Sequence, residues 1–137
     1  MNQHAPTYLL DTDWVINYLI GLEVYRDKFE ELGLSRIGII IVSVAELYEG
    51  VYYSRDPRNS EQRLEKFLEG IMVMEINDDI CKAFGRERGR LRQRGLMIGD
   101  FDLMIASTAL HYHIPLCTSN RQHFDRIKGL EIVSIIP

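Results

Sequence analysis

Four acidic or amide side chains lie just beyond apolar stretches of the sequence, where a buried strand would end or a helix would begin. They are Asp11, Glu46, Asp102 and Asn120. Carboxylates held close together repel one another, and some take up a proton unless a cation joins them. Mg²⁺ and Mn²⁺ prefer oxygen ligands, and such a metal can activate water for attack on a phosphodiester and stabilise the leaving oxygen. These residue types therefore point to metal-dependent phosphodiester hydrolysis, provided that the fold brings them together.

Short apolar runs predict the strands that would position these side chains. The predicted strands are residues 7–10, 36–42, 71–76, 114–117 and 130–136. Segments with helical spacing lie between them, at 13–20, 22–34, 43–51, 60–68, 77–95 and 99–112. This alternation predicts an α/β domain with a central, mostly parallel five-stranded sheet flanked by helices. Sites in such folds gather at the carboxyl ends of the strands, which is where Asp11 and Asn120 are expected.

The composition fits one soluble domain spanning residues 1–137. The chain is 46% hydrophobic and 26% charged, as is usual for a globular domain. No apolar run is long enough to span a bilayer, and the first residues lack the basic and apolar parts of a secretory signal. Cys81 and Cys117 imply no disulfide framework, so we expect a cytoplasmic protein with no membrane partner.

Each candidate also has an ordinary structural interpretation. Asp11 fits a turn, and Asp100 fits the cap of the helix that is expected to begin near residue 99. Glu46 fits a capping box with Ser43, in which each side chain bonds the backbone N–H of the other residue. The polar residues after the fourth predicted strand fit hydrogen-bonding positions in a loop. No single residue is specific, so the hypothesis rests on their order and spacing.

Four segments together resemble the PIN-domain family. Residues 8–12 (YLLDT) are similar to its opening motif, and residues 43–50 (SVAELYEG) resemble the second motif of its VapC-type toxins. Residues 99–106 (GDFDLMIA) resemble the third motif, in which the acid two residues before Met104 is a metal ligand. Residues 118–120 (TSN) resemble the fourth. The segments occur in the family's order and spread over nearly the whole chain.

The resemblance implies a PIN-like fold and an endoribonuclease that depends on Mg²⁺ or Mn²⁺. It assigns Asp11, Glu46 and Asp102 to the metal site, with Asn120 as a further member of the catalytic group. It also implies that the protein is the toxin of a toxin–antitoxin pair. An antitoxin protein that inhibits the enzyme, an RNA substrate and a homodimer are therefore the expected partners.

The fourth motif departs from the family at Asn120, where many PIN domains carry an aspartate. A neutral amide oxygen holds a metal less strongly than a carboxylate, so the sequence leaves open whether one metal binds or two. Asp100 and His123 lie nearby as accessory candidates, although histidine is a poor ligand for Mg²⁺. Thr118 and Ser119 are further accessory candidates from the same motif.

A run of arginines precedes the third motif and offers a binding strip for RNA. Arg86, Arg90 and Arg94 are four residues apart, so they are predicted to share one helix face. Such a strip would bind phosphates and would offset the net charge of −4, which by itself disfavours RNA. The alternative is an ordinary solvated face, because charge runs on helices often have no ligand.

Aromatic residues offer two further surfaces. Three tyrosines after Glu46 fit either base stacking or packing: Tyr48, Tyr52 and Tyr53. Four residues near the first acid fit either a partner helix or the core: Trp14, Tyr18, Leu22 and Tyr25.

A phosphatase of the haloacid dehalogenase type is the main rival enzyme. Residues 11–15 (DTDWV) fit its DxDx[TV] signature, with Asp13 as general acid and Ser43 as a phosphate-binding hydroxyl. That chemistry needs a lysine after the middle strands, and neither Lys66 nor Lys82 is placed there.

A phospho-acceptor receiver module is a second alternative, from a different class of protein. Asp78 lies near the position of its acceptor, but no lysine ends the last predicted strand. A binding module without activity is the third alternative, which the presence of all three candidate acids disfavours.

Overall fold

A single parallel sheet forms the centre of the molecule. The computed structural model describes residues 5–135 of the chain. Its strands are β1 (Tyr8–Leu10), β2 (Ile37–Ile40), β3 (Met72–Met74), β4 (Leu116–Cys117) and β5 (Ile132–Val133). They are arranged in the order β3-β2-β1-β4-β5, and every pair of neighbours is parallel. The predicted α/β class and five-stranded sheet are therefore confirmed.

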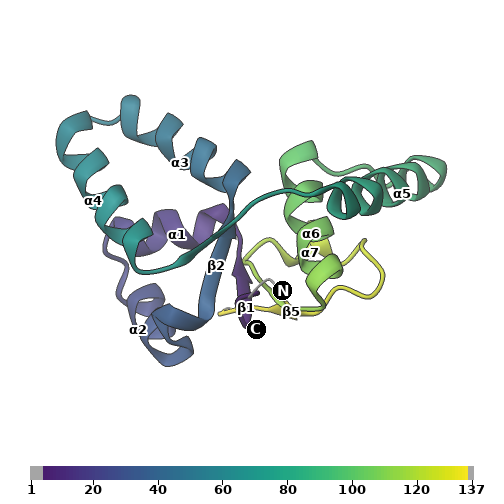
Figure 1. Ribbon diagram of the computed structural model, residues 1–137, viewed down its shortest axis with the longest axis horizontal. Helices are drawn as coiled ribbons and strands as arrows, with labels where there is room; N and C mark the ends of the chain where they lie inside the picture. Colours follow the sequence, from purple (N-terminus) through teal and green to yellow (C-terminus); the bar gives the residue numbers. More distant parts are fainter. Residues whose placement is uncertain (1–4, 136–137) are drawn as a thin grey trace.

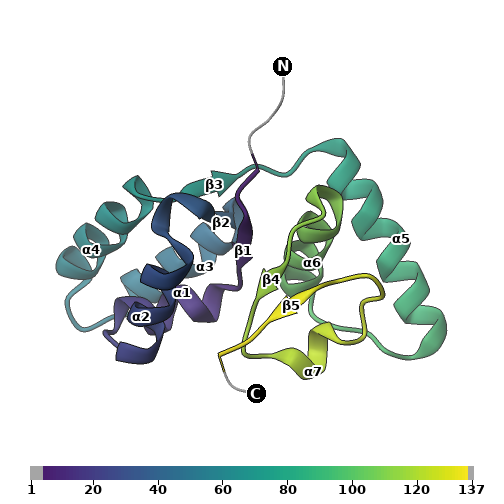
Figure 2. The same ribbon diagram turned by 90° about the horizontal axis from the view of Figure 1, so that it is seen from below.

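Helices cover the two faces of the sheet, as Figures 1 and 2 show. One face carries α1 (Thr12–Leu19), α2 (Glu23–Leu32), α3 (Ile41–Tyr52) and α4 (Pro57–Glu69). The other carries α5 (Asp78–Arg94), α6 (Asp100–Tyr112) and α7 (Arg121–Phe124). A short 3₁₀ helix, Leu34–Arg36, leads into β2. Within residues 5–135 no helix has the length and apolar character needed to cross a membrane.

Alternate side chains of the central strands β1 and β4 enter the two cores. Leu9 packs among the residues of α5 and α6, whereas Leu10 packs among the aromatic residues of α1 and α2. Leu116 and Cys117 of β4 divide between the two cores in the same way. Since successive side chains of a strand point to opposite faces, a strand covered on both sides must be apolar throughout. This is why the strands appear in the sequence as continuous apolar runs.

Two predicted helix starts are wrong. The second predicted strand reaches residue 42, but β2 ends at Ile40 and α3 begins at Ile41. Ser43 therefore lies inside α3, and the predicted capping box does not form. The β-branched residues at 41 and 42 suggested a strand, yet intrinsic propensity is weak and tertiary contacts override it. Similarly, α1 begins at Thr12, one residue before the predicted start at residue 13, and its cap residue is Asp11.

Other boundaries were predicted more closely. The Asn77 side chain caps α5 by accepting a hydrogen bond from the backbone N–H of Ile80 (2.9 Å), and Gly95 ends the helix in the left-handed conformation. The helix predicted from residue 60 begins three residues earlier, since Pro57 is the first residue of α4. The last three strands are shorter than predicted, and Ile136 of the fifth prediction lies outside the described residues.

Gly38 allows β2 to lie close to its neighbours. A Cβ atom at this position would lie 2.9 Å from the Met72 carbonyl oxygen and 2.9 Å from Cγ of Pro6. Backbone cannot move away as a flexible side chain can, so we predict that Gly38→Ala lowers the free energy of unfolding by about 1–3 kcal/mol. Urea unfolding followed by circular dichroism would measure the change.

Gly50 provides the matched control. It lies within α3, and no atom would lie within 4 Å of an added Cβ. Gly50→Ala should therefore raise the free energy of unfolding by roughly 0.5–1 kcal/mol, because alanine favours a helix. Equal stability of Gly38→Ala and the wild type would contradict the close approach at β2.

Candidate active site

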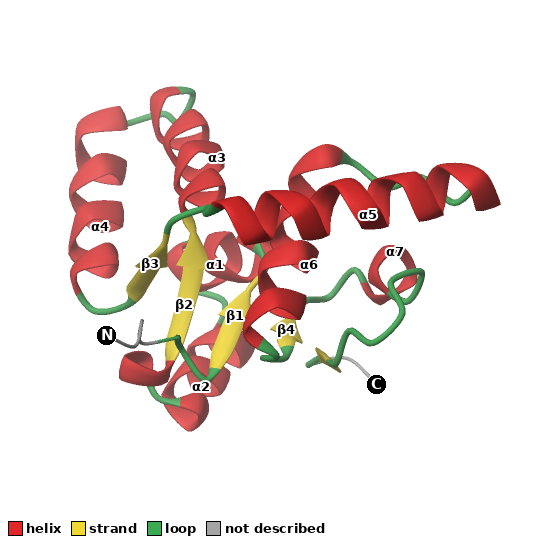
Figure 3. Ribbon diagram, turned by 45° about the vertical axis from the view of Figure 1, so that its right-hand side comes forward, coloured by secondary structure: helices red, strands yellow, loops and turns green. Residues whose placement is uncertain are grey.

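The strand order brings the separate candidate residues to one edge of the sheet. β1 lies between β2 and β4, and parallel strands end at the same edge (Figure 3). Asp11 directly follows β1, Glu46 lies on α3 just beyond β2, and Asn120 follows β4. Asp102 lies in the first turn of α6, and its charge raises the pKa of both Asp11 and Glu46. The three acids are therefore electrostatic neighbours.

Asp11 is the buried member of this group, with 5% of its surface exposed. The Thr118 hydroxyl donates a hydrogen bond to its Oδ2 atom at 2.7 Å. The pKa of Asp11 is raised from 3.8 to about 7, mainly by burial, with the charges of Asp102 and Asp13 adding to the rise and the Thr118 hydrogen bond opposing it. A cation that binds next to this carboxyl group would stabilise its charged form and lower its pKa.

Glu46 is held by the first residue of α1. The Thr12 hydroxyl donates to Oε1 of Glu46 at 2.7 Å and lies 2.9 Å from the Ser43 hydroxyl. Burial is the largest cause of the raised pKa of Glu46, the charge of Asp102 adds to it, and the Thr12 hydrogen bond opposes both. Ser43 and Glu46 thus share Thr12 as a partner instead of capping α3.

Asp102 is half-buried and lies beside the fourth motif. Its Oδ2 atom is 3.7 Å from Nδ1 of His123, and that same ring nitrogen is 2.9 Å from Nδ2 of Asn120. Burial raises the pKa of Asp102, whereas His123 lowers it. The structure therefore brings the accessory candidate His123 next to one acid and next to Asn120.

Two aromatic side chains fix the loop after β4. The Trp14 indole N–H donates to Oγ of Ser119 at 3.1 Å, and the Tyr25 hydroxyl is 2.9 Å from the same atom. The Asn120 backbone N–H donates to the Thr118 hydroxyl at 2.9 Å. Trp14 and Tyr25 are buried, so the core interpretation of these two residues is confirmed and they offer no surface to a partner.

Asp100 points away from the other acids. The residue that caps α6 is Gly99, so the prediction that Asp100 caps this helix is wrong. The Asp100 carboxylate instead pairs with the Arg88 guanidinium of α5. This ion pair joins α5 to the start of α6 and gives Asp100 a partner outside the acidic group.

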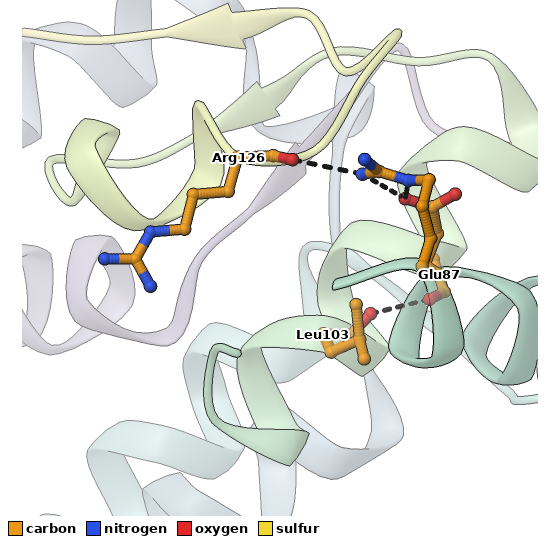
Figure 4. Close-up of polar contacts among 5 residues, drawn as sticks. Glu87, Leu103 and Arg126 are labelled. Carbon is orange, nitrogen blue, oxygen red and sulfur yellow. Dashed lines mark hydrogen bonds and ion pairs between the residues drawn. The ribbon is translucent and has the colours of Figure 1, made fainter. Parts of the chain in front are cut away.

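The three arginines of the predicted RNA strip have different surroundings. Nη2 of Arg90 lies 2.8 Å from Oε1 of Glu87 and donates to the Arg126 carbonyl oxygen at 3.1 Å (Figure 4). Arg86 is exposed and lines a hollow with His111, near the end of α6 that lies away from Asp102. Arg94 is exposed in the last turn of α5. A role for these residues in RNA binding stays a prediction.

Sequence reasoning missed two contributors to the site. Thr12 was seen only as part of the opening motif, although its position next to Asp11 was a signal that it could reach the same edge. Asp13 was expected to matter only for a phosphatase, yet its charge raises the pKa of Asp11, Glu46 and Asp102. Asp13 is exposed at the start of α1, so it belongs to the electrostatic surroundings of the acids.

The donor chemistry of the site fits a hard divalent cation. Asp11, Glu46 and Asp102 supply carboxylate oxygens, and burial together with nearby acidic charges raises their pKa values, an effect that a bound cation would oppose. In the described part of the chain, no three His, Cys, Asp or Glu side chains are already set to hold a metal ion. Binding would therefore require these side chains to close around the ion, and the metal stays a prediction.

Comparisons with known proteins agree with this fold. The family model described as PIN domain matches residues 8–130. Ribonuclease VapC1 of Methanocaldococcus jannaschii is 35% identical over 134 residues, which cover 96% of this chain and 90% of that protein. The tRNA(fMet)-specific endonuclease VapC of Salmonella typhimurium is 29% identical, over 91% of this chain and 95% of that protein.

A solved structure of a related protein has the same fold. The crystal structure of DNA-bound VapBC from Salmonella typhimurium superposes with a TM-score of 0.89 at 27% identity, over 96% of this chain and 99% of the other. The five-stranded parallel sheet, with candidate acids at its carboxyl edge, defines the class as an α/β protein. The chain belongs to the PIN-domain family and groups with its VapC-type ribonucleases. The phosphatase and receiver alternatives gain no support.

The buried Asp11 carboxyl predicts a pH dependence of stability. The folded protein holds this proton at pH values where the unfolded chain has lost it, because folding raises the pKa from 3.8 to about 7. The free energy of unfolding of the metal-free protein should therefore fall as the pH rises from about 4 to about 7. Asp11→Asn should flatten this fall and raise stability at pH 8 by at least about 1 kcal/mol.

Urea unfolding across this pH range would measure both effects. Asp27→Asn, which removes an exposed acid of α2, is the control and should leave the pH profile unchanged. If the pH profile of Asp11→Asn superimposes on that of the wild type, the pH dependence of stability does not come from burial of the Asp11 carboxyl group, and the prediction is wrong.

Proposed function

We propose that this protein is a metal-dependent endoribonuclease that acts as the toxin of a toxin–antitoxin pair. The observation that carries the proposal is the group formed by buried Asp11 with Glu46 and Asp102 at the carboxyl edge of the sheet. The chain's membership of the PIN-domain family and its identity to VapC ribonucleases support the reaction type. The metal and the RNA target are parts of the proposal that await a test.

Each residue of the site has a part in this reaction. When bound, Mg²⁺ or Mn²⁺ supplies an activated water and stabilises the leaving oxygen. Asp11, Glu46 and Asp102 bind the cation, and the Thr118 and Thr12 hydroxyls hold two of these carboxylates in place. Asn120 has its side-chain nitrogen next to His123 and offers only a neutral oxygen to a cation, which favours a single strong metal site.

Loss of one acid should stop cleavage without unfolding the protein. We predict that Asp102→Asn lowers the rate of RNA cleavage by roughly 100-fold or more, because a neutral amide binds the cation poorly. The purified protein, freed of any partner, would be incubated with total RNA and Mn²⁺ or Mg²⁺, and then with EDTA. Cleavage should require the metal and should disappear in EDTA.

Two neighbouring variants make this test specific. Asp100→Asn changes an acid two residues away whose carboxylate pairs with Arg88, and it should keep most of the activity. Asp13→Asn would abolish the activity of a phosphatase of the dehalogenase type, but it should reduce the activity of a nuclease only slightly. A fully active, folded Asp102→Asn protein would overturn the assignment of the site.

An apolar groove beside Glu46 supports a protein partner. The groove has a volume of about 220 Å³, lies between α1, α3 and α4, and is lined by Ile16, Ile20 and Leu47 among others. Ile20 is 64% exposed at its rim, which is costly for an apolar side chain that has no partner. The Salmonella relative was solved as a VapBC complex. We therefore place the apolar face of the antitoxin in this groove.

A charge in the groove should separate inhibition from catalysis. Ile20→Glu should weaken antitoxin binding by about 10-fold or more, because a carboxylate would be buried against apolar surface. It should leave RNA cleavage by the free protein unchanged. Val24→Glu, at an exposed position of α2 outside the groove, is the control and should bind antitoxin normally.

Isothermal titration with the antitoxin, beside the RNA cleavage assay, would measure these effects. Unchanged antitoxin affinity of Ile20→Glu would show that the partner binds elsewhere. The homodimer implied by the family resemblance stays a prediction, which light scattering of the free protein would test.

A further inference from the structure

Three buried or half-buried polar groups are linked at the point where α1 and α3 meet. Thr12 is the first residue of α1, and its hydroxyl lies between Oγ of Ser43 (2.9 Å) and Oε1 of Glu46 (2.7 Å). Thr12 and Ser43 are both buried, so water does not replace these contacts freely. The described residues contain no buried side-chain nitrogen or oxygen without a partner, and these two hydroxyls are part of that satisfied set.

A count of protons gives this chain of hydroxyls a direction. The Thr12 hydroxyl has one proton and two close neighbours. A carboxylate is the stronger acceptor, and the shorter distance is the one to Glu46, so the Thr12 proton belongs in that bond. The Ser43 hydroxyl is the second close neighbour, at 2.9 Å on the α3 side of the Thr12 oxygen. Thr12 is therefore held between Ser43 and Glu46, with its proton directed to Glu46.

The fold makes this arrangement rigid. α1 and α3 leave neighbouring parallel strands at the same edge, which places Thr12 opposite α3. Ser43 and Glu46 are three residues apart on α3, so they lie on the same face of the helix and both reach Thr12. A β-branched threonine has few rotamers, and its contacts with Ser43 and Glu46 hold the Thr12 hydroxyl between them. Glu46 is long and flexible, and this contact fixes where its second oxygen points.

We propose that Thr12 and Ser43 are positioning residues that hold the Glu46 carboxylate ready for the divalent cation. The inference rests on the proposed function, because it supposes that Glu46 is a metal ligand. Groups that hydrogen-bond to a ligand orient it, and their loss typically weakens metal affinity by about 10–100-fold. The hydroxyl of residue 12 is therefore needed for tight metal binding, whereas its methyl group only fills space.

Direct binding of Mn²⁺ to the metal-free protein tests this role without any RNA. Free Mn²⁺ would be measured by electron paramagnetic resonance as the ion is titrated into each variant. Thr12→Val keeps the shape and removes the hydroxyl, so its dissociation constant should rise by about 10-fold or more. Thr12→Ser keeps the hydroxyl and should bind within about threefold of the wild type, and Ser43→Ala should fall between them.

Thr108→Val is the matched control. Thr108 is also a buried threonine in a helix, and its hydroxyl donates to the Met104 carbonyl oxygen of α6 at 2.9 Å. Loss of the Thr108 hydroxyl in Thr108→Val should leave the Mn²⁺ affinity of the protein unchanged. Circular dichroism would establish that each variant is folded, and if Thr12→Val fails to fold, Ser43→Ala carries the test.

The outcomes separate this inference from the function on which it rests. Wild-type affinity of folded Thr12→Val, or of Ser43→Ala where it carries the test, would overturn the positioning role and leave the proposed nuclease intact. Failure of Thr12→Ser to restore binding would also overturn it, because the shape of residue 12 would then matter and its hydroxyl would not. No Mn²⁺ binding by the wild type would overturn both the metal site and this inference.

Discussion

Burial of the Asp11 carboxyl group at the end of the central strand is the constraint on which the site depends. Removing a carboxylate from water costs several kcal/mol unless hydrogen bonds or opposite charges compensate. Here the Thr118 hydroxyl compensates in part, while the charges of Asp102 and Asp13 add to the cost. A pKa near 7 is the result of this imbalance. The metal-free protein thus gives up stability to keep an acid that a cation would stabilise.

The parallel sheet determines which groups can reach Asp11. Because β1 lies between β2 and β4, two segments begin beside its carboxyl end: α3, which follows β2, and the loop that follows β4. From one side α3 brings Glu46, and from the other the loop after β4 brings Thr118. The aromatic core under α1 extends to the same place, since Trp14 and Tyr25 both hold Ser119. The packing of this core therefore also positions the loop after β4, so a substitution in the core should change the geometry of the site.

The sequence predicted where the strands lie along the chain and which polar residues follow them, because apolar runs and the acids after them are local signals. It could not predict which groups pair, because pairing depends on tertiary distances. Ser43 and Glu46 have the spacing of a capping box, yet α3 starts two residues before Ser43, and both side chains turn to Thr12. Arg90 has the spacing of a binding strip, yet it pairs with Glu87. For Ser43 and Glu46 the partner Thr12 decided between interpretations that the spacing left open, whereas a role of Arg90 in RNA binding stays a prediction.

The central claim is that Asp11, Glu46 and Asp102 bind one divalent cation at the carboxyl edge of the sheet. Anomalous diffraction from crystals of the protein grown with Mn²⁺ would test it most directly, beside crystals of Asp102→Asn. We predict a manganese peak within coordination distance of these carboxylate oxygens, and its loss or marked weakening in Asp102→Asn. A peak elsewhere in the molecule, or none at millimolar Mn²⁺ around intact carboxylates, would contradict the claim.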